Sequence, residues 1–394
     1  MRYWGVTGTN GKTTTTWIAA AFINAAKDRR CGYVTTVEVN TGSRQFYTGY
    51  TTPPLAQLKE IFAEMERNGC TDCVMEVSSH AIHQHRTGDT VFSGGVFTNL
   101  SEDHLDYHKT MEAYFDVKLD FARQIAAAHP TTPDMGRRDL PPYVVCLDGG
   151  YGREMFNAVG NLAVNVIPVS IDCNRQPSTA FDLGGLQLAG DYNKSNVLCA
   201  AALAEHAGVP HDAIQAVIPT LKPRWGRLEL VENPAVKAKV YVDFAHTPDG
   251  LEKVLSAVRG MMASNLAPSN PRPLKPSNPS LWVVFGAGGD RDPMKRPLMG
   301  AACAKFADRL VVTSDNPRSE EPMSIIEAIL CGIDSCRRET TAVEPDRKKA
   351  IEFALREAGE GDVVIIAGKG HETTQEIAGV KHPFDDREIV RFWR

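Results

Sequence analysis

The 394-residue chain has no run of about 18 consecutive apolar residues, which is the length that a membrane-spanning helix requires. We therefore expect no insertion into a membrane. The chain also lacks the charged and then apolar segments of a secretory signal, because a strand-like pattern and a glycine-rich turn follow the first residues directly. Both absences favour a protein of the cytoplasm.

A strong excess of one charge is missing too. The 43 lysine and arginine residues nearly balance the 48 aspartate and glutamate residues, which leaves a formal net charge of -5. Proteins that bind nucleic acids through their overall charge are strongly basic, so a nucleic acid is not an expected partner. A local basic pocket for phosphate groups is compatible with this balance.

The sequence shows no disulfide framework and no complete set of zinc ligands. Its nine cysteines are an odd number scattered along a long chain, which is typical of reduced thiols. Cys70 and Cys73 form one C-x-x-C pair, but neither a second pair nor a nearby histidine completes a zinc site. We expect these two thiols to be buried among apolar side chains.

Short β-branched segments alternate with longer helical patterns, which is typical of parallel strands covered by helices. In the first part of the chain we expect strands at 31–39, 71–79, 143–147 and 165–170 and a helix at 193–208. A second alternation follows "LKPRWGRLELVEN", so we predict two α/β units, residues 1–222 and 223–394.

The second unit repeats the same pattern of strands and helices. Strands are expected at 239–245, 281–287, 309–315 and 362–368, and helices at 248–260, 297–307, 324–333 and 346–358. Two segments interrupt the alternation. Residues 126–142 are expected to form a surface excursion, and residues 261–280, rich in proline, serine and asparagine, a flexible surface insertion.

The stretch "GVTGTNGKTTTTW", residues 5–17, has the composition of a phosphate-binding loop between a strand and a helix. Gly8 and Gly11 let backbone N–H groups approach phosphate oxygens, Lys12 supplies a positive charge, and Thr13 supplies a hydroxyl for magnesium. The start of the following helix adds its positive dipole end. Val6 occupies the position of the usual first glycine. A plain glycine-containing turn is the alternative interpretation.

Five further parts of the chain, taken in order with this loop, resemble the Mur ligase family, and within it the MurE type. They are "YTTP" at 50–53, "MEVSSHAIHQHR" at 75–86, "FTNLSEDHLDYH" at 97–108, "FGAGGDRDPMKRPLMG" at 285–300, and "SDNPRSEEP" at 314–322 with "AGKGHE" at 367–372. The resemblance covers nearly the whole chain and is far more specific than the phosphate loop alone.

The resemblance implies a P-loop ATPase domain with a mostly parallel sheet, followed by a Rossmann-like α/β domain that binds an amino acid. Members use ATP to phosphorylate a peptide carboxylate, and an amino acid's amine then displaces phosphate from the acyl phosphate. We therefore expect an ATP-dependent ligase of peptidoglycan precursor synthesis. Its expected partners are small-molecule and peptide substrates, and we expect a monomer.

One departure from the family concerns the acceptor. Full-length relatives carry an additional N-terminal domain that holds the uridine nucleotide, whereas this chain starts where the ATPase domain would start. We therefore expect either a chain from which this domain has been removed or a natural short form that works with a different carrier. The alternative function is a short Mur-like ligase that acts on an acceptor without uridine diphosphate, such as a polyamino acid, a folate-type molecule or a free muropeptide.

Acyl phosphate chemistry brings several negative charges together, so the site needs cations, and hard oxygen ligands suit magnesium. The resemblance assigns Thr13 and Glu76 to one Mg²⁺ ion and Glu76 with His104 to a second, and it makes Lys12 catalytic. It also implies that Lys118 reacts with carbon dioxide to become a carbamate, N6-carboxylysine. The alternatives from the residues alone are a salt bridge for Glu76, a surface histidine and a solvated helical lysine.

The resemblance assigns ATP binding to residues of both predicted units. They are Gly8, Thr9, Asn10, Gly11, Lys12, Thr13, Thr14, Asn193, Asn196, Arg227, Asp243 and His246. The two asparagines match a pair near the adenine, and the arginine matches one near the phosphates. Asn193 is also a candidate for the residue that caps the following helix.

Peptide contacts are expected from Thr51, Thr52, Ser78 and Arg86, because two hydroxyls and a guanidinium fork suit a carboxylate-bearing peptide. From the residues alone, the two threonines would simply form a turn before the helix that Pro53 and Pro54 introduce.

The segment "DNPR" indicates which amino acid is added. In relatives that add meso-diaminopimelate, this motif supplies an asparagine and an arginine, here Asn316 and Arg318, to the second carboxylate. Arg318 would also repel the ammonium of lysine. The complete set matched to amino-acid binding is Arg291, Asp315, Asn316, Arg318, Gly368 and Glu372. A simple turn with proline at a favoured position is the alternative for this segment.

A non-catalytic ATP-binding protein is a third interpretation. Such a protein is expected to have lost Lys12, Glu76, His104 or Lys118, and all four are present.

Overall fold

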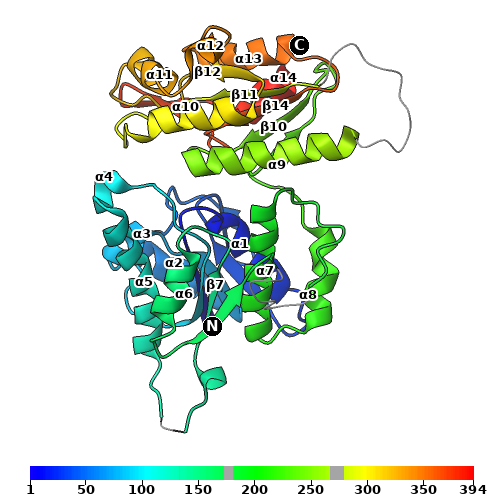
Figure 1. The fold of residues 1–394 in the computed structure, drawn as a ribbon. Coiled ribbons are helices and arrows are strands. Elements are labelled where there is room, and N and C mark those ends of the chain that lie inside the picture. Colours follow the sequence, from blue (N-terminus) through cyan, green and yellow to red (C-terminus); the bar gives the residue numbers. More distant parts are fainter. Residues whose placement is uncertain (133, 173–180, 267–278) are drawn as a thin grey trace. The chain divides into compact units, whose positions relative to one another are not determined.

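A computed structural model describes residues 1–132, 134–172, 181–266 and 279–394. These residues form two compact units, Met1–Lys222 and Pro223–Arg394 (Figure 1). Each unit has a sheet with helices on both faces, so the α/β fold class predicted from the alternation of strands and helices is confirmed.

Within its described residues, the N-terminal unit contains an eight-stranded sheet in the order β4-β3-β2-β5-β1-β6-β7-β8. The strands are β1 (Arg2–Thr7), β2 (Cys31–Val34), β3 (Val39–Asn40), β4 (Gln45–Phe46), β5 (Asp72–Glu76), β6 (Phe92–Phe97), β7 (Pro142–Cys146) and β8 (Asn165–Val169). The six strands from β2 to β8 in this order run parallel, and β3 and β4 add an antiparallel edge. β1 therefore lies between β5 and β6, and the carboxyl ends of all three meet at one edge.

Helices cover both faces of this sheet (Figure 1). One face carries α1 (Lys12–Ile23) and α7 (Asp191–His206), with α8 (His211–Val217) beside them; the other carries α2 (Leu55–Arg67), α3 (Ser79–His83), α5 (Met111–Ala128) and α6 (Gly152–Val159). The described part of the unit also contains the short helix α4 (Leu105–His108) and the 3-10 turns Arg137–Asp139 and Ile218–Thr220. The sequence of α2 explains its packing, because its buried residues Leu58, Ile61, Phe62 and Met65 recur at helical spacing on one side.

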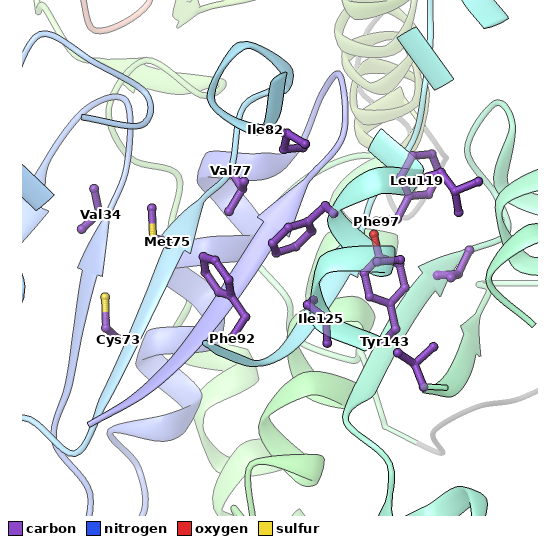
Figure 2. Close-up of a cluster of buried hydrophobic side chains, with 14 of the residues drawn as sticks. Val34, Cys73, Met75, Val77, Ile82, Phe92, Phe97, Leu119, Ile125 and Tyr143 are labelled. Carbon is purple, nitrogen blue, oxygen red and sulfur yellow. The ribbon is translucent and has the colours of Figure 1, made fainter. Parts of the chain in front are cut away.

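The core under α2, α5 and α6 is a continuous apolar cluster. Figure 2 shows Met75 and Val77 from the β5 side of the sheet, with Phe97, Ile125 and Tyr143 in the same cluster. Gly5 belongs to this packing, because a Cβ atom on it would lie 2.2 Å from the ring of Phe121 on α5. The absence of a side chain at Gly5 therefore lets α5 pack closely on the sheet.

Within its described residues, the C-terminal unit contains a six-stranded sheet in the order β13-β12-β11-β14-β10-β9. The strands are β9 (Glu229–Val231), β10 (Lys239–Asp243), β11 (Leu281–Phe285), β12 (Arg309–Val312), β13 (Ala342–Val343) and β14 (Val363–Ala367), and β15 (Thr374–Ile377) and β16 (Val380–Pro383) form a separate hairpin. Only β9 is antiparallel to its neighbour in the described sheet.

Helices again lie on both faces of this second sheet (Figure 1). One group is α9 (Pro248–Leu266), α10 (Lys295–Phe306) and α11 (Pro322–Leu330), and the other is α13 (Arg347–Glu357) and α14 (Asp386–Phe392), while α12 (Ser335–Arg338) is a short connection. Apolar residues of α13 such as Ile351 and Leu355 pack on Val284 and Ile366 of the strands.

One strand prediction was wrong. Residues 31–39 form two strands, because a turn after Val34 lets β3 return antiparallel with Asn40 opposite Tyr33. Thr35 closes this turn: its backbone N–H donates to Glu38 O at 3.0 Å, and its hydroxyl accepts from Glu38 N at 3.0 Å. Local side-chain hydrogen bonding overrides the β-branched character of the segment.

Other expectations concern the surface and the thiols. Cys70 and Cys73 are buried and free, as are four of the other described cysteines. Within 126–142, most residues from 129 to 139 that the structure describes are exposed. Most of the insertion at 261–280 lies outside the described residues. None of the helices in the described part of the chain combines the length and the apolar composition that crossing a bilayer requires.

A fully buried ion pair joins several elements of the C-terminal unit. Arg347 donates to both carboxylate oxygens of Asp386, at 2.9 and 2.8 Å, and neither side chain is exposed. The same guanidinium donates to Ser314 O at 3.3 Å and to Ala367 O at 2.9 Å. It therefore holds the segment that follows β12 and the end of β14 against α13 and α14.

We predict that Asp386→Ala lowers the free energy of unfolding of the C-terminal unit by about 3 to 5 kcal/mol, because it leaves a buried guanidinium without its counter-charge. Lys349→Ala, which removes an exposed ion pair with Asp346 on the same helix α13, should change it by no more than about 0.5 kcal/mol. Urea denaturation followed by circular dichroism measures both. Equal stabilities of the two variants would contradict the role given to the buried pair.

Candidate active site

The glycine-rich loop follows β1 and packs against the segment that follows β6. Gly8 has a φ of 148°, and a Cβ atom on it would lie 1.9 Å from Thr98 Oγ1. Gly11 has a φ of 85°, and a Cβ atom there would lie 2.4 Å from Asn196 Oδ1 of α7. Both positions therefore require glycine, for backbone conformation and for space. This close packing argues against a plain turn.

Side chains after β6 hold the loop in place. Thr9 N donates to Asn99 O and Asn10 N to Asn99 Oδ1, both at 2.9 Å, and Asn10 O accepts from Thr98 Oγ1 at 2.7 Å. Lys12 Nζ donates to Gly8 O at 3.0 Å and to Thr9 O at 2.8 Å, so its ammonium lies over the loop. Thr13 and Thr14, in the first turn of α1, are buried. The arrangement joins backbone N–H groups, a helix N-terminus and a cation, which together suit a polyphosphate.

Glu76 ends β5 directly beside Val6 of β1 and is 1% exposed. Its Oε1 accepts from Thr36 N at 2.8 Å. A buried carboxylate at the carboxyl end of a parallel strand is well suited to bind a cation.

The four residues expected to contact a peptide gather around the end of β5. Thr52 Oγ1 donates to Glu76 O at 2.8 Å and accepts from Ser78 N at 3.0 Å. Arg86 Nη1 donates to Thr52 O at 3.4 Å, and Thr51 Oγ1 lies 2.9 Å from Thr36 Oγ1. The predicted peptide contacts and Glu76 therefore share one edge of the sheet.

Lys118 is buried in α5, with 1% of its surface exposed, so the solvated alternative was wrong. Its Nζ donates to Thr7 Oγ1 at 3.3 Å and lies 5.0 Å from the centre of the Tyr114 ring. Burial, with the nearby charge of Lys12, lowers the pKa of Lys118 well below its usual value, although Asp103 opposes this. The neutral amine that carbon dioxide requires is therefore favoured at this position.

His104 has a left-handed backbone, with a φ of 56°, at the residue that precedes α4. Its Nε2 lies 3.4 Å from Asp103 Oδ2, and its ring centre lies 5.0 Å from that of His80. Burial lowers the pKa of His104, Asp103 opposes the shift, and His80, Lys12 and Lys118 add to it. A neutral imidazole keeps a lone pair that can bind a metal ion.

Among the described residues, no group of three or more His, Cys, Asp or Glu side chains is close enough to hold a metal ion by itself. The metal ligands expected from the sequence are instead a hydroxyl, a carboxylate and an imidazole, from Thr13, Glu76 and His104. Because Mg²⁺ commonly takes most of its ligands from phosphates and water, this sparse protein donor set fits it when ATP is bound.

Tyr114 is a component of this site that the sequence analysis missed. Its hydroxyl lies 3.2 Å from Thr9 Oγ1 of the loop, and its ring stacks on His108, with centres 4.9 Å apart. His108 Nε2 in turn lies 2.9 Å from Ser79 Oγ. The available signal was the spacing of four between Tyr114 and Lys118, which puts both on one face of α5.

The two asparagines of α7 lie beside the loop. Asn196 Oδ1 accepts from Thr15 Oγ1 at 3.3 Å, and Asn196 Nδ2 donates to Asn193 Oδ1 at 3.4 Å. The capping interpretation of Asn193 was wrong, because Gly190 precedes the helix and Asn193 lies inside its first turn. Asn193 Nδ2 instead donates to Ala189 O at 2.7 Å.

In the C-terminal unit, Arg227, Asp243 and His246 gather at the end of β10. Asp243 accepts from Leu228 N at 2.6 Å and from Ala245 N at 2.7 Å. Burial raises the pKa of Asp243, while Arg227 opposes the shift. The Arg227 guanidinium lies 4.3 Å from the centre of the Phe244 ring, and His246 Nδ1 lies 2.7 Å from Phe244 O.

The segments after β12 and β14 bring the predicted amino-acid contacts together. Asn316 Nδ2 donates to Glu372 Oε2 at 2.9 Å. Arg318, at a φ of 54°, donates through Nη1 to Gly289 O at 2.5 Å. A Cβ atom on Gly288 would lie 2.9 Å from Arg318 Nη1 and 3.8 Å from Arg291 Cγ, so the two arginines flank one glycine.

Asp315 and Gly368 also meet in this group. Asp315 Oδ2 is buried and has no hydrogen-bond partner among the described residues. A Cβ atom on Gly368, which has a φ of 118°, would lie 2.3 Å from that oxygen. Glycine is therefore required where the two segments touch.

The chain matches two family descriptions, the Mur ligase middle domain over residues 6–204 and the Mur ligase, glutamate ligase domain over residues 226–370. A relative from Chromobacterium violaceum, named UDP-N-acetylmuramoyl-L-alanyl-D-glutamate--2,6-diaminopimelate ligase, is 37% identical in an alignment of 404 positions that covers 98% of this chain and 76% of the relative. A relative of the same name from Aquifex aeolicus is 36% identical over 98% of this chain and 76% of its own length.

Solved structures show the same fold. One with that ligase name is 32% identical and has a TM-score of 0.58 over 99% of this chain and 77% of its own. A pseudomurein peptide ligase type C from Methanothermus fervidus has a TM-score of 0.61 at 16% identity, covering 94% of this chain and 76% of its own, and this likeness concerns the fold alone.

We predict that Gly8→Ala weakens ATP binding about tenfold or more, because a strained backbone conformation costs about 1 to 3 kcal/mol and the added methyl displaces Thr98. Gly49→Ala is the matched control, since Gly49 also has a positive φ, 82°, but nothing lies within 4 Å of its added Cβ atom. Isothermal titration calorimetry with magnesium and ATP measures both. Equal affinities of the two variants would show that the loop does not bind ATP.

Proposed function

This chain belongs to the Mur ligase family of ATP-dependent amide ligases, and we propose that it adds meso-diaminopimelate to the D-glutamate of a UDP-linked muramoyl dipeptide. The observation that carries the choice of amino acid is the meeting of Asn316 and Glu372, 56 residues apart in sequence, in the group that contains Arg318. A diamino dicarboxylate needs donors for its second carboxylate and an acceptor for its second ammonium, and these side chains supply both.

The proposed reaction has two steps. An oxygen of the dipeptide carboxylate attacks the γ-phosphorus of ATP, which forms an acyl phosphate and releases ADP. The amine of the incoming amino acid then attacks the acyl carbon, loses a proton, and displaces inorganic phosphate to leave an amide. Within the N-terminal unit, the loop Gly8–Thr14 would hold the triphosphate, with Asn193 and Asn196 as further ATP contacts. Arg227, Asp243 and His246 are the ATP contacts that we propose for the C-terminal unit.

Charge neutralisation is the main task of the side chains around the phosphates. Lys12 lies over the loop and would face the phosphate oxygens. Thr13, Glu76 and His104 would hold Mg²⁺, which when bound offsets the negative charge that develops during phosphoryl transfer. Thr51, Thr52, Ser78 and Arg86 would orient the carboxylate that attacks.

Lys118 would complete the site as a carbamate. Its buried neutral amine nitrogen would attack carbon dioxide and lose a proton, so that an uncharged group beside Thr7 would become an anion with two oxygens. Burial lowers the pKa of Lys118, which supplies the neutral amine for this step. The carbamate would then support the metal ion in the way that a carboxylate does.

Phosphate release with ATP, magnesium and the UDP-linked muramoyl dipeptide tests the function. We expect release that depends on an added amino acid, fast with meso-diaminopimelate and at least about tenfold slower with L-lysine, because Arg318 repels a lone ammonium. A higher rate with L-lysine would contradict the choice of amino acid. Release only with a free dipeptide or muropeptide would favour the alternative acceptor.

We predict that Lys118→Ala lowers turnover by about 10- to 100-fold, since it removes a group that supports a metal ligand. A short carboxylic acid such as acetate should restore part of the activity by occupying the space left by the side chain. Lys194→Ala, at an exposed lysine paired with Asp191, is the control and should retain wild-type turnover. Wild-type turnover of Lys118→Ala, or equal stimulation of the control by acetate, would remove the carbamate from the mechanism.

A further inference from the structure

Lys369 is fully buried in the segment that follows β14, between two glycines. A Cβ atom on Gly370 would lie 2.7 Å from Phe244 Cβ, and one on Gly368 would lie 2.3 Å from Asp315 Oδ2. Both glycines have positive φ, 118° at Gly368 and 53° at Gly370. The backbone on each side of the lysine is therefore fixed by close packing, which directs its side chain into the unit.

The Lys369 ammonium closes a triangle with two of the proposed amino-acid contacts. Its Nζ donates to Asn316 Oδ1 at 3.0 Å and to Glu372 Oε2 at 2.8 Å. Asn316 Nδ2 donates to the same Glu372 oxygen at 2.9 Å. A buried ammonium thus contacts Asn316 and Glu372, the two side chains that are expected to bind the distal groups of the amino-acid substrate.

This triangle fixes the direction of the Asn316 amide. Its oxygen accepts from Lys369 Nζ and from Glu376 N, at 3.0 and 2.9 Å. With two donors on the oxygen side, the amide cannot rotate by half a turn without placing its NH₂ group against them. The NH₂ group is consequently held on the side of Glu372, where it can donate to a carboxylate.

The same ammonium also offsets the charge of Glu372. One Glu372 oxygen accepts both hydrogen bonds of the triangle, while about a third of the side chain, 34%, stays exposed. A substrate with only a distal ammonium is therefore attracted less strongly to the Glu372 carboxylate, because the Lys369 ammonium already offsets part of its charge. A substrate that also brings a carboxylate gains the donors of Asn316 and Arg318 in addition.

We propose that Lys369 is a positioning residue that makes the site select an amino acid with a distal carboxylate over one with a distal ammonium alone. The proposal rests on the proposed function, since it concerns the same amino-acid site. Lys369 acts through Asn316 and Glu372, and the fold of the unit has a separate buried anchor in Arg347 and Asp386.

Steady-state kinetics of Lys369→Met and Lys369→Gln test this role, with meso-diaminopimelate, L-lysine and ATP each varied in turn. For Lys369→Met we expect the KM for diaminopimelate to rise about tenfold, because the variant loses one charge-assisted hydrogen bond. The KM for ATP should change less than about twofold. The preference for diaminopimelate over L-lysine, as a ratio of kcat/KM, should fall about tenfold as well. Lys369→Gln should restore part of the KM but not the preference, because it keeps a donor without the charge.

Lys253→Met is the matched control, because it removes a lysine that is paired with Asp249 at 2.7 Å on α9, away from this triangle. It should leave all three KM values and the preference unchanged. An unchanged preference in Lys369→Met, or a parallel rise of the KM for ATP, would overturn the proposal.

A measurement on the unaltered protein covers the case in which the variants do not fold. 2-Aminopimelate carries only the distal carboxylate, and L-lysine carries only the distal ammonium. The proposal predicts a higher kcat/KM for 2-aminopimelate, and the reverse order contradicts it. If the unaltered protein uses diaminopimelate and this order is reversed, only the role of Lys369 is contradicted. If it uses no amino acid, the proposed function is contradicted, and so is the role of Lys369 that depends on it.

Discussion

The parallel pairing of β1 with β5 and β6 is the constraint on which the N-terminal site depends. The register sets Val6 beside Glu76 and Thr7 beside Phe97, so three strands end at the same level. The phosphate loop that leaves β1 consequently contacts Thr98, which follows β6, and Glu76 ends β5 beside Val6, just before the loop begins. A slip of one residue in either pairing would turn alternate side chains to the wrong face of the sheet and separate these groups. Lys118 depends on the same register, because its contact is with Thr7.

The C-terminal unit gathers its polar groups by a related principle. The segments after β12 and β14 pack closely where Gly368 has no side chain, and a buried guanidinium binds a carbonyl after β12 and one at the end of β14. Burying that charge is costly, and the carboxylate of Asp386 offsets the cost. In both units the proposed contacts therefore lie at the carboxyl ends of parallel strands, where loops of unrelated sequence are brought together.

The sequence was sufficient to predict the α/β fold class, because the spacing of apolar residues within each segment indicates whether it forms a buried strand or a helix with one buried face. It did not predict the turn at Thr35, where one hydroxyl redirects a β-branched run, or the short edge strands. Lys118 shows the limit for the site: its burial depends on Thr7 and Tyr114, which only the folded sheet and helix bring to it. Lys369 has the same character, since its partner Asn316 is 53 residues away.

The central claim is that the dipeptide carboxylate itself receives the γ-phosphoryl group. The most direct test labels both oxygens of that carboxylate with ¹⁸O, lets the enzyme complete ligation with ATP and meso-diaminopimelate, and analyses the released phosphate by mass spectrometry. An acyl phosphate intermediate transfers one labelled oxygen to each phosphate and leaves the other in the new amide. Phosphate without label, or release of AMP and pyrophosphate in place of ADP, would contradict the account.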